Sequence, residues 1–201
     1  MQKLKNKIGA LNGNGYENFR WFFTSNDVLV VGGKSDEQNE ATIANFLRPE
    51  YTIMHTTEPG SPFMIIQTEK PSKKDLEETA IFCACFSQQW KKGEKLISID
   101  IFKGEQVYKN KSMKTGTFGI IGEKKTTKVK PELVLVIQKG KLRAVPNTTK
   151  EEKLAVIVPG KLSKEEAANK IAKIIRNKYH FPVSKEEIMQ AIPSDRLAVK
   201  G

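Results

Sequence analysis

A glycine pair followed by a lysine marks the part of the chain best suited to binding a phosphate group. The run Gly-Gly-Lys at residues 32–34 precedes Ser35, and Gln38 follows three residues later. This spacing is typical of a capped helix start and predicts a helix from about Asp36 to Leu47. Lys34, Gln38 and Asn39 would then lie at the helix N-terminus, where free backbone N–H groups and the positive end of the helix dipole attract phosphate.

A second phosphate-binding candidate is a lysine-rich segment in the middle of the chain. Between residues 109 and 130 there are seven lysines and a single acid, Glu123. The lysines are Lys109, Lys111, Lys114, Lys124, Lys125, Lys128 and Lys130. Residues 109–117 also supply hydroxyl groups, an amide and a glycine, an inventory that contacts phosphates and sugars without selecting bases. A solvated surface loop has the same composition, so these residues alone leave both interpretations open.

His55 is predicted at the end of a strand, just before a polar loop that contains Ser61. It could serve as the general base of an RNA-processing or tRNA-modifying enzyme, but no orienting acid or nucleophile stands at a fixed spacing from it. The sequence has no Walker loop, no zinc-ligand spacing and no carboxylates paired at helical spacing. A structural or RNA-contacting role is therefore favoured over catalysis, and neither a cofactor nor a metal is expected. Cys83 and Cys85 stand two positions apart in a helical pattern and point to different faces, which predicts neither a mutual disulfide nor a shared metal.

The charge balance favours a polyanionic partner. The 201 residues contain 34 Lys and Arg against 23 Asp and Glu, a formal net charge of +11. RNA, DNA and an anionic membrane surface all fit this excess, although a lysine-rich proteome would give the same balance. A hydrophobic content of 38% is enough to build a core. There is no apolar run of membrane-spanning length and no apolar signal region after the basic N-terminus, so we expect a cytoplasmic protein without a membrane partner.

The elements that would position these residues alternate between strands and capped helices. Strands are expected at residues 21–24, 28–31, 51–55, 63–67, 96–102, 105–108 and 117–121. A helix with an apolar stripe is expected from Ser72 to a stop at Gly93. After Pro131, strands are expected at 133–137, 141–145 and 154–158, the last ended by Pro159 and Gly160, followed by capped helices that begin at Ser163 and Ser184.

The predicted fold class is α+β, with a mixed or antiparallel sheet packed against a few helices and a small C-terminal α+β unit. Three segments are expected. Residues 1–15 form a flexible N-terminal segment, residues 16–130 an RNA-binding domain, and residues 131–201 a small C-terminal α+β domain.

Ordered motifs in this chain resemble the signature of NFACT-R, the RNA-binding module of the NFACT proteins. They are Gly-Gly-Lys-x-x-x-Gln-Asn-Glu at residues 32–40, Leu-Arg ending at Arg48, and His-x-x-x-Pro-Gly-Ser at residues 55–61. Further matches are Val107-Tyr-Lys109, Thr115-Gly-Thr-Phe118 and Gly122-Glu-Lys-Lys125. The family motif has a second histidine where this chain has Pro62, so no role of that histidine is carried over. The last third of the chain resembles the C-terminal region that follows NFACT-R in archaeal and eukaryotic members, and nothing here resembles their N-terminal domain or coiled coil.

The resemblance implies a non-enzymatic RNA-binding protein that contacts tRNA and/or the large ribosomal subunit in ribosome-associated quality control of stalled nascent chains. With the patterns above, it predicts RNA contacts at Arg20, Lys34, Gln38, Asn39, Arg48, His55, Ser61, Lys109, Lys111, Lys114, Lys124 and Lys125. Aromatic residues are few and stand mostly at predicted core positions, which favours recognition of backbone and shape over stacking of bases. Two alternatives are an enzyme that uses His55 and a scaffold whose apolar surface binds a separate NFACT N-terminal half.

Overall fold

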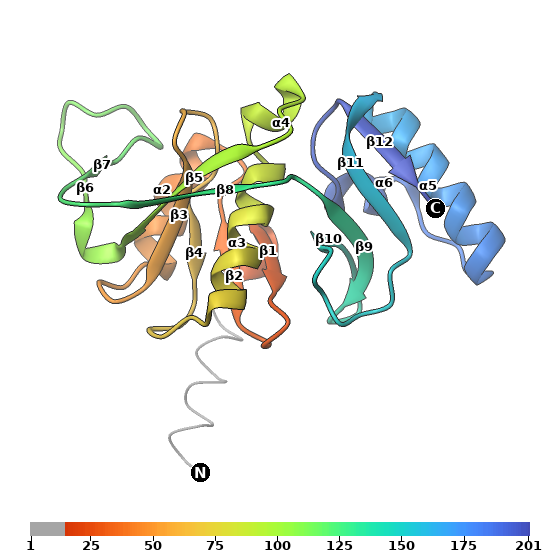
Figure 1. Cartoon of the computed structure of the whole chain (residues 1–201), viewed down its shortest axis with the longest axis horizontal. Coiled ribbons are helices and arrows are strands. Elements are labelled where there is room, and N and C mark those ends of the chain that lie inside the picture. The colour runs from red at the N-terminus through yellow and green to blue at the C-terminus, as the bar shows by residue number, and fades with distance from the viewer. Residues whose placement is uncertain (1–14) are drawn as a thin grey trace, which may run out of the picture.

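Two sheets lie side by side along the long axis of the molecule, each with helices packed on it (Figure 1). The structure is a computed structural model that describes residues 15–201. The prediction for residues 1–15 therefore lies outside the described residues, apart from Gly15. Every strand pair in the two sheets is antiparallel, and the mixture of sheets and helices confirms the predicted α+β class.

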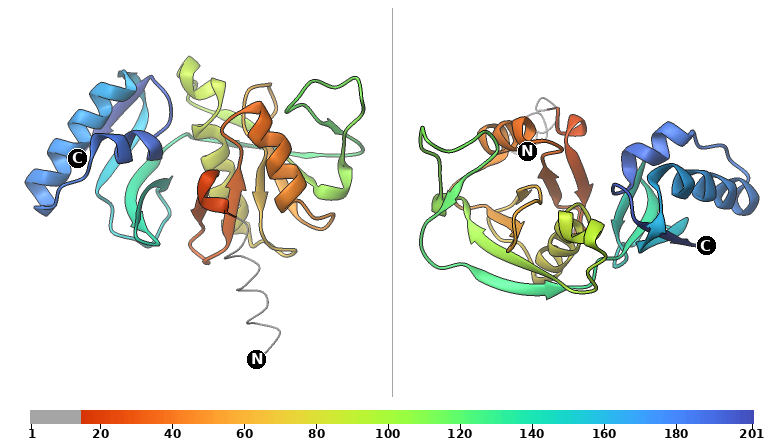
Figure 2. Two further views of the ribbon diagram at one scale, coloured as in Figure 1. Left: turned by 180° about the vertical axis from the view of Figure 1, so that it is seen from behind. Right: turned by 90° about the horizontal axis from the view of Figure 1, so that it is seen from above.

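The first sheet has six strands in the order β1-β2-β4-β3-β5-β8. They are β1 (Arg20–Phe23), β2 (Leu29–Gly32), β3 (Thr52–Thr56), β4 (Met64–Ile66), β5 (Ile97–Lys103) and β8 (Lys125–Val129). Because side chains alternate along a strand, Trp21 and Val31 enter one apolar cluster while Phe22 and Val30 enter another. Helix α2 (Asp36–Phe46) belongs to the first cluster and α3 (Lys73–Cys85) to the second, so the two helices cover opposite faces of this sheet (Figure 2).

A small ribbon extends the layer on the α2 side. The 3-10 turn η2 (Gly104–Gln106) leads from β5 into this ribbon. The other 3-10 turn, η1 (Tyr16–Asn18), precedes β1. The ribbon consists of β6 (Val107–Tyr108) and β7 (Gly119–Ile120), and residues 109–118 form the loop between them. Val107, Phe118 and Ile120 pack against the apolar cluster that contains α2, which fixes this loop beside that helix.

The second sheet has the order β10-β9-β11-β12. Its strands are β9 (Leu133–Gln138), β10 (Lys141–Pro146), β11 (Ala155–Leu162) and β12 (Leu197–Lys200), and its helices are α5 (Lys164–Tyr179) and α6 (Lys185–Ala191). The helices cover the side turned away from the first sheet (Figure 2). One apolar cluster runs from the first sheet through Phe82 on α3 and Leu135 on β9 to Ile171 on α5. None of the helices formed by residues 15–201 combines the length and apolarity that crossing a membrane requires.

Side chains of the second sheet cover the free edge of β1. The amide of Gln138 accepts a hydrogen bond from Phe23 N (2.7 Å) and donates one to Phe23 O (2.8 Å), as a neighbouring strand would. The Arg143 guanidinium donates to Trp21 O through Nη2 (2.7 Å) and Nε (3.2 Å) and lies 4.3 Å from the Trp21 ring. The edge strand is therefore satisfied by side chains instead of a seventh strand.

The helix expected from Ser72 to Gly93 is two helices. Its predicted start is confirmed, because Ser72 and Asp75 form a reciprocal capping box at α3. The chain leaves the helix at Phe86, and Ser87 starts α4 (Gln88–Lys92) by accepting a hydrogen bond from Trp90 N. The break frees Gln88 N to donate to Gly60 O (2.8 Å), a tertiary contact that a continuous helix would not permit.

Three expectations about strands need correction. No strand is expected from the sequence at residues 125–129 or 197–200, yet these residues form β8 and β12, each on the edge of its sheet. Strand β11 does not end at Pro159 and Gly160 but continues with a register shift to Leu162, which pairs with Leu197. A bulge is a place where proline and glycine are tolerated in a sheet. Finally, residues 105–106 belong to the turn η2, so that β6 is only two residues long.

Candidate nucleic-acid interface

The start of helix α2 forms as the sequence predicts, with one difference in its capping. Ser35 Oγ accepts a hydrogen bond from Gln38 N (3.2 Å). The Gln38 side chain, however, accepts from Lys34 N (3.0 Å) and donates to Asn18 O (3.3 Å), while Lys34 Nζ donates to the same carbonyl (2.8 Å). Lys34 and Gln38 thus anchor the helix start to the segment before β1.

Gly33 and Asn39 pack together behind this helix start. A Cβ at Gly33 would collide with the Asn39 side chain and would lie 2.7 Å from Asn39 N, so only glycine fits. Asn39 is only 8% exposed, and its Oδ1 accepts no hydrogen bond from any residue that the structure describes. An unpartnered buried amide is costly in a folded protein and marks this wall as a candidate ligand contact.

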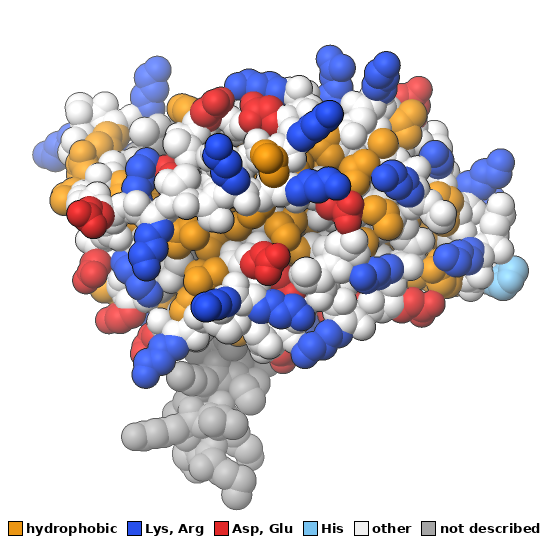
Figure 3. Space-filling view, viewed as in Figure 1, with side chains coloured by type: hydrophobic (Ala, Val, Ile, Leu, Met, Phe, Trp, Pro, Cys, Tyr) orange, Lys and Arg blue, Asp and Glu red, His pale blue; other side chains and the backbone are white. Residues whose placement is uncertain are grey.

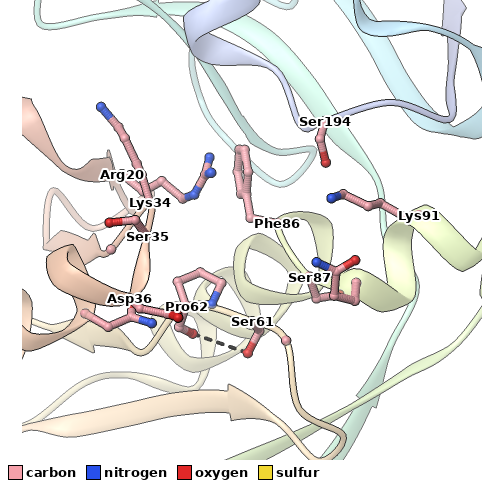
Figure 4. Close-up of a pocket in the computed structure, with 14 residues that line it drawn as sticks. Arg20, Lys34, Ser35, Asp36, Ser61, Pro62, Phe86, Ser87, Lys91 and Ser194 are labelled. Carbon is pink, nitrogen blue, oxygen red and sulfur yellow. Dashed lines mark hydrogen bonds between the residues drawn. The ribbon is translucent and has the colours of Figure 1, made fainter. Parts of the chain in front are cut away.

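A pocket of about 350 Å³ lies in front of this helix start. The residues that line it are Arg20, Gly33, Lys34, Ser35, Asp36, Asn39, Gly60, Ser61, Pro62, Phe86, Ser87, Gln88, Lys91 and Ser194. Arg20 and Lys34 enter from one side, Lys91 and Ser194 from the other, and Phe86 stands between them (Figure 4). The Arg20 guanidinium stacks 4.2 Å from the Phe86 ring centre. Four of the predicted contact residues, Arg20, Lys34, Asn39 and Ser61, therefore meet in one pocket.

The charges around Arg20 are mostly positive. Burial, followed by the charge of Arg143, lowers the pKa of Arg20 to about 10, and the guanidinium stays charged at neutral pH. Burial and the charges of Arg20 and Arg143 lower the pKa of Lys34. The pKa of Lys164 is also lowered, first by burial and then by Arg20. This concentration of cations lowers the free energy of any anion that enters the pocket.

The lysine loop lies directly beside the helix start, although the two are far apart in the sequence. Gly116 has a left-handed φ of 75°, and a Cβ there would lie 2.6 Å from Asp36 Cα. Gly116 N donates to Glu40 Oε1 (2.8 Å), and Lys109 forms an ion pair with the same carboxylate. Figure 2, seen from above, shows the loop between β6 and β7 next to α2. The two predicted phosphate-binding regions thus flank the same helix.

Members of the lysine-rich segment differ in what they contact. Lys109 Nζ also donates to the carbonyls of Lys114 (2.8 Å) and Thr117 (3.0 Å) and lies 4.8 Å from the Phe118 ring, so its ammonium holds the loop together. Lys124 forms an ion pair with the buried Asp100. The remaining five, Lys111, Lys114, Lys125, Lys128 and Lys130, are exposed, and their ammonium groups make no hydrogen bond or ion pair with residues 15–201. Lysine and arginine side chains are spread over the face that β8 crosses (Figure 3).

His55 is not among the residues that line the pocket. Its Nδ1 is 2.7 Å from Thr56 O, and its ring packs 4.6 Å from the Phe63 ring. Burial lowers its pKa, outweighing the opposite effects of the Thr56 carbonyl and of Asp100, which pairs with His55 across β3 and β5. Burial alone would raise the pKa of Asp100, but hydrogen bonds from Lys124, Thr126 and Thr57 together hold it below its usual value.

No chain of nucleophile, base and orienting acid forms around His55 among the described residues. Ser61 Oγ accepts from Thr56 N (2.9 Å) and has no hydrogen bond to the histidine ring. Cys83 and Cys85 are buried free thiols, and burial raises the pKa of Cys83 to about 12. In the part of the chain from 15 to 201, no three His, Cys, Asp or Glu side chains gather as a metal site.

Some predicted contacts lie away from the pocket, and some pocket residues were missed. Arg48 is exposed beyond the far end of α2, 5.4 Å from the Tyr51 ring, and Lys125 begins β8. Phe86, Lys91 and Ser194 line the pocket but carry no motif that would single them out in the sequence. They reach it because α3 breaks at Phe86 and because the loop before β12 crosses to the first sheet.

Comparison with known proteins decides the family. Residues 18–122 match the model of the NFACT protein RNA-binding domain, which is more than half of the chain. The chain belongs to the NFACT family. The matched domain contains the pocket's α2 wall, Phe86 and Lys91, and the whole loop between β6 and β7.

Curated relatives and a solved structure agree with this membership. The chain is 28% identical over 132 residues to the ribosome quality control complex subunit NEMF homolog of Drosophila melanogaster. This match covers 62% of this chain and 13% of that protein. It is 28% identical over 78 residues to the human subunit NEMF, covering 37% of this chain and 7% of that protein. The NFACT chain also matches the structure of the C-terminal part of a fibronectin/fibrinogen-binding protein from Streptococcus suis, with a TM-score of 0.52 and 19% identity over 56% of this chain and 45% of that one. This last likeness concerns the fold alone.

Proposed function

We propose that this NFACT chain is a non-enzymatic RNA-binding protein that contacts tRNA and/or the large ribosomal subunit during quality control of stalled nascent chains. Membership in the family of the NFACT RNA-binding domain supports RNA as the partner. The relatives named as ribosome quality control subunits support the cellular process, a role that belongs to the cytoplasm. Each match covers only a small part of those relatives, so their full activities are not transferred.

The observation that carries the RNA-binding proposal is the set of unpaired lysines. Five ammonium groups of the lysine-rich segment are exposed and have no acidic partner among residues 15–201. Lys111 and Lys114 lie on the loop beside α2, while Lys128 and Lys130 lie on and after β8. Such groups bind phosphates by releasing counterions, which requires no base selection.

Two variants of equal charge test this proposal. Lys111→Glu with Lys114→Glu should weaken tRNA binding about tenfold, because two favourable phosphate contacts become repulsive. The control, Lys170→Glu with Lys173→Glu, makes the same charge change at exposed positions of α5. Binding is measured by fluorescence anisotropy with labelled tRNA, and both variants are checked by their melting curves. Equal affinities for the two variants would show that only net charge matters and would reject the loop as the binding site.

The ribosomal part of the proposal needs its own test. We propose that the chain sediments with large ribosomal subunits that carry a stalled peptidyl-tRNA more than with empty subunits. A separate NFACT N-terminal half is a further proposed partner, which should co-purify with the chain from native extract. Equal sedimentation with both kinds of subunit would contradict the quality-control assignment while leaving RNA binding intact.

The proposed domain division follows the sheets. We propose that residues 16–130 and 131–201 are two domains, because each contributes a complete sheet and the family match ends before the second begins. His55 is assigned a structural role, since its ring has no hydrogen bond to a hydroxyl or carboxylate in the described chain. His55→Ala should therefore leave RNA affinity within about twofold of the wild type if the variant folds.

A further inference from the structure

The pocket in front of α2 has positive charge that the protein does not neutralise. The Arg20 guanidinium has five N–H donors, yet no described residue accepts a hydrogen bond from it or forms an ion pair with it. The ammonium group of Lys91 has no partner among residues 15–201 either, and that of Lys34 is bonded only to the carbonyl of Asn18. Asp36 is the only carboxylate among the lining residues.

The backbone and Asn39 add to this charge. Helix α2 is eleven residues long and directs its N-terminus at the pocket, where the dipole favours an anion. Asn39 lines the same wall, is more than nine-tenths buried, and has an amide oxygen without a partner in the described chain. The Asn39 side chain also carries an amide NH2 group, a donor that suits an anion in the pocket. Gly33 leaves the room for this arrangement.

We infer that this pocket binds one phosphate group, held chiefly by Arg20 and Lys34 at the start of α2, with Lys91 on the opposite side. Arg20 is suited to the role because its stacking on Phe86 fixes the guanidinium plane, so that two N–H groups can donate to two phosphate oxygens. The far wall contains Ser194, and Lys164 adds charge nearby, so residues from both sheets would contribute to the bound state. The phosphate could be a chain-end monoester or an internal diester of RNA, and naming RNA as its source rests on the proposed function.

Inorganic phosphate is the first probe, titrated by calorimetry at constant ionic strength with chloride as the replaced anion. We expect saturable binding that Arg20→Gln weakens at least tenfold and Lys91→Gln weakens less. Arg176→Gln, which removes an exposed guanidinium from α5, is the matched control and should bind phosphate like the wild type. If Arg20→Gln fails to fold, the phosphate affinities of Lys91→Gln and Lys170→Gln are compared instead, because both of these positions are exposed. Equal binding by pocket and control variants, or no saturable binding by the wild type, would overturn the inference.

Short RNAs of one sequence, with a 5′-phosphate or a 5′-hydroxyl, then identify the source. A preference for the 5′-phosphate that Arg20→Gln abolishes assigns a chain-end phosphate, and equal weakening of both RNAs assigns an internal diester. The loop variant Lys111→Glu with Lys114→Glu separates this inference from the proposed function. If that variant loses RNA but keeps phosphate, both hold; if Arg20→Gln keeps phosphate while the loop variant loses RNA, the pocket inference alone fails.

Discussion

Lysines that look equivalent in the sequence have different roles in the folded chain. Lys109 and Lys124 form ion pairs with Glu40 and Asp100, respectively. Lys111 and Lys114, which share the loop between β6 and β7 with Lys109, have no acidic partners in the described chain. An ammonium group already paired gains less from a phosphate, because the existing pair must first be broken. Under the proposed function, we therefore expect the exposed lysines around these two to bind RNA, while Lys109 holds the loop in shape.

His55 supports a prediction about stability and pH. Burial lowers the pKa of His55 in the folded chain below the ordinary value of 6.5. At a pH between the folded-state pKa and 6.5, the unfolded chain therefore binds a proton at this residue that the folded chain does not. The contribution of neutral His55 to stability is thus complete above about pH 6.5 and decreases as the pH falls toward its folded-state pKa. Urea unfolding of wild type and His55→Gln at pH 7.5, 6.5 and 5.5 should show the wild type losing more stability on acidification. Parallel pH profiles for the two proteins would contradict this.

At the scale of elements, the loop between β6 and β7 depends on α2 for its conformation. Glu40 binds both Gly116 N and Lys109, and it forms these contacts from the middle of the helix. The loop is therefore pre-organised, which reduces the conformational entropy that RNA binding would otherwise cost. Its exposed lysines point outward because the backbone beneath them is fixed to the helix.

Glu40→Gln tests this dependence, because its two expected effects on RNA affinity have opposite signs. Removing a negative charge should by itself strengthen RNA binding, but loosening the loop should weaken it by about threefold. The amides of residues 109–118 should also exchange hydrogen faster in a mass-spectrometric measurement. Glu77→Gln removes the same charge from the exposed side of α3 and serves as control. Tighter RNA binding by both variants would show that the loop does not need its anchor.

Locally encoded elements could be predicted from the sequence, and those defined by a partner strand could not. The capping boxes at Ser72 and Ser163 predicted the starts of α3 and α5, because the capping side chain and its partner are three residues apart. Strand β8 is mostly polar and β12 has only four residues, and the assignment of these two edge strands depends on pairing with β5 and β11. The pocket was predicted in part. The α2 side carried a motif, while Phe86 and Lys91 enter it at a helix break that is accompanied by a tertiary hydrogen bond from Gln88 N to Gly60 O.

Over the whole molecule, the two sheets are joined through the edge of β1 and through α3. Gln138 substitutes for a missing strand at Phe23, and the apolar cluster continues from one sheet to the other. The pocket lies close to this junction and takes Ser194 from the second half. Residues 131–201 therefore contribute to the wall of a pocket that is otherwise formed by residues before 130. The division of the sequence at residue 130 does not reveal this contribution.

Gln138→Ala measures how strongly the junction stabilises the molecule. The substitution leaves the N–H and C=O of Phe23 without their partners and should cost about 2 to 4 kcal/mol of unfolding free energy. The control is Gln190→Ala, at an exposed position of α6, which should change stability by less than about 0.5 kcal/mol. Urea denaturation is followed by the fluorescence of Trp21, which lies in β1 itself, and of Trp90 in α4. A small effect of Gln138→Ala would mean that water replaces the amide at this edge.

The proposed RNA binding depends on phosphate contacts made by unpaired lysines, and its dependence on salt concentration tests these contacts most directly. The logarithm of the association constant, plotted against the logarithm of salt concentration for single-stranded RNA, has a slope of about −0.7 per phosphate neutralised. Lys111→Gln with Lys114→Gln should make the slope less negative by about 1.4, which corresponds to two lost contacts. An unchanged slope, or RNA binding that does not depend on salt, would contradict binding through the phosphate backbone at this loop.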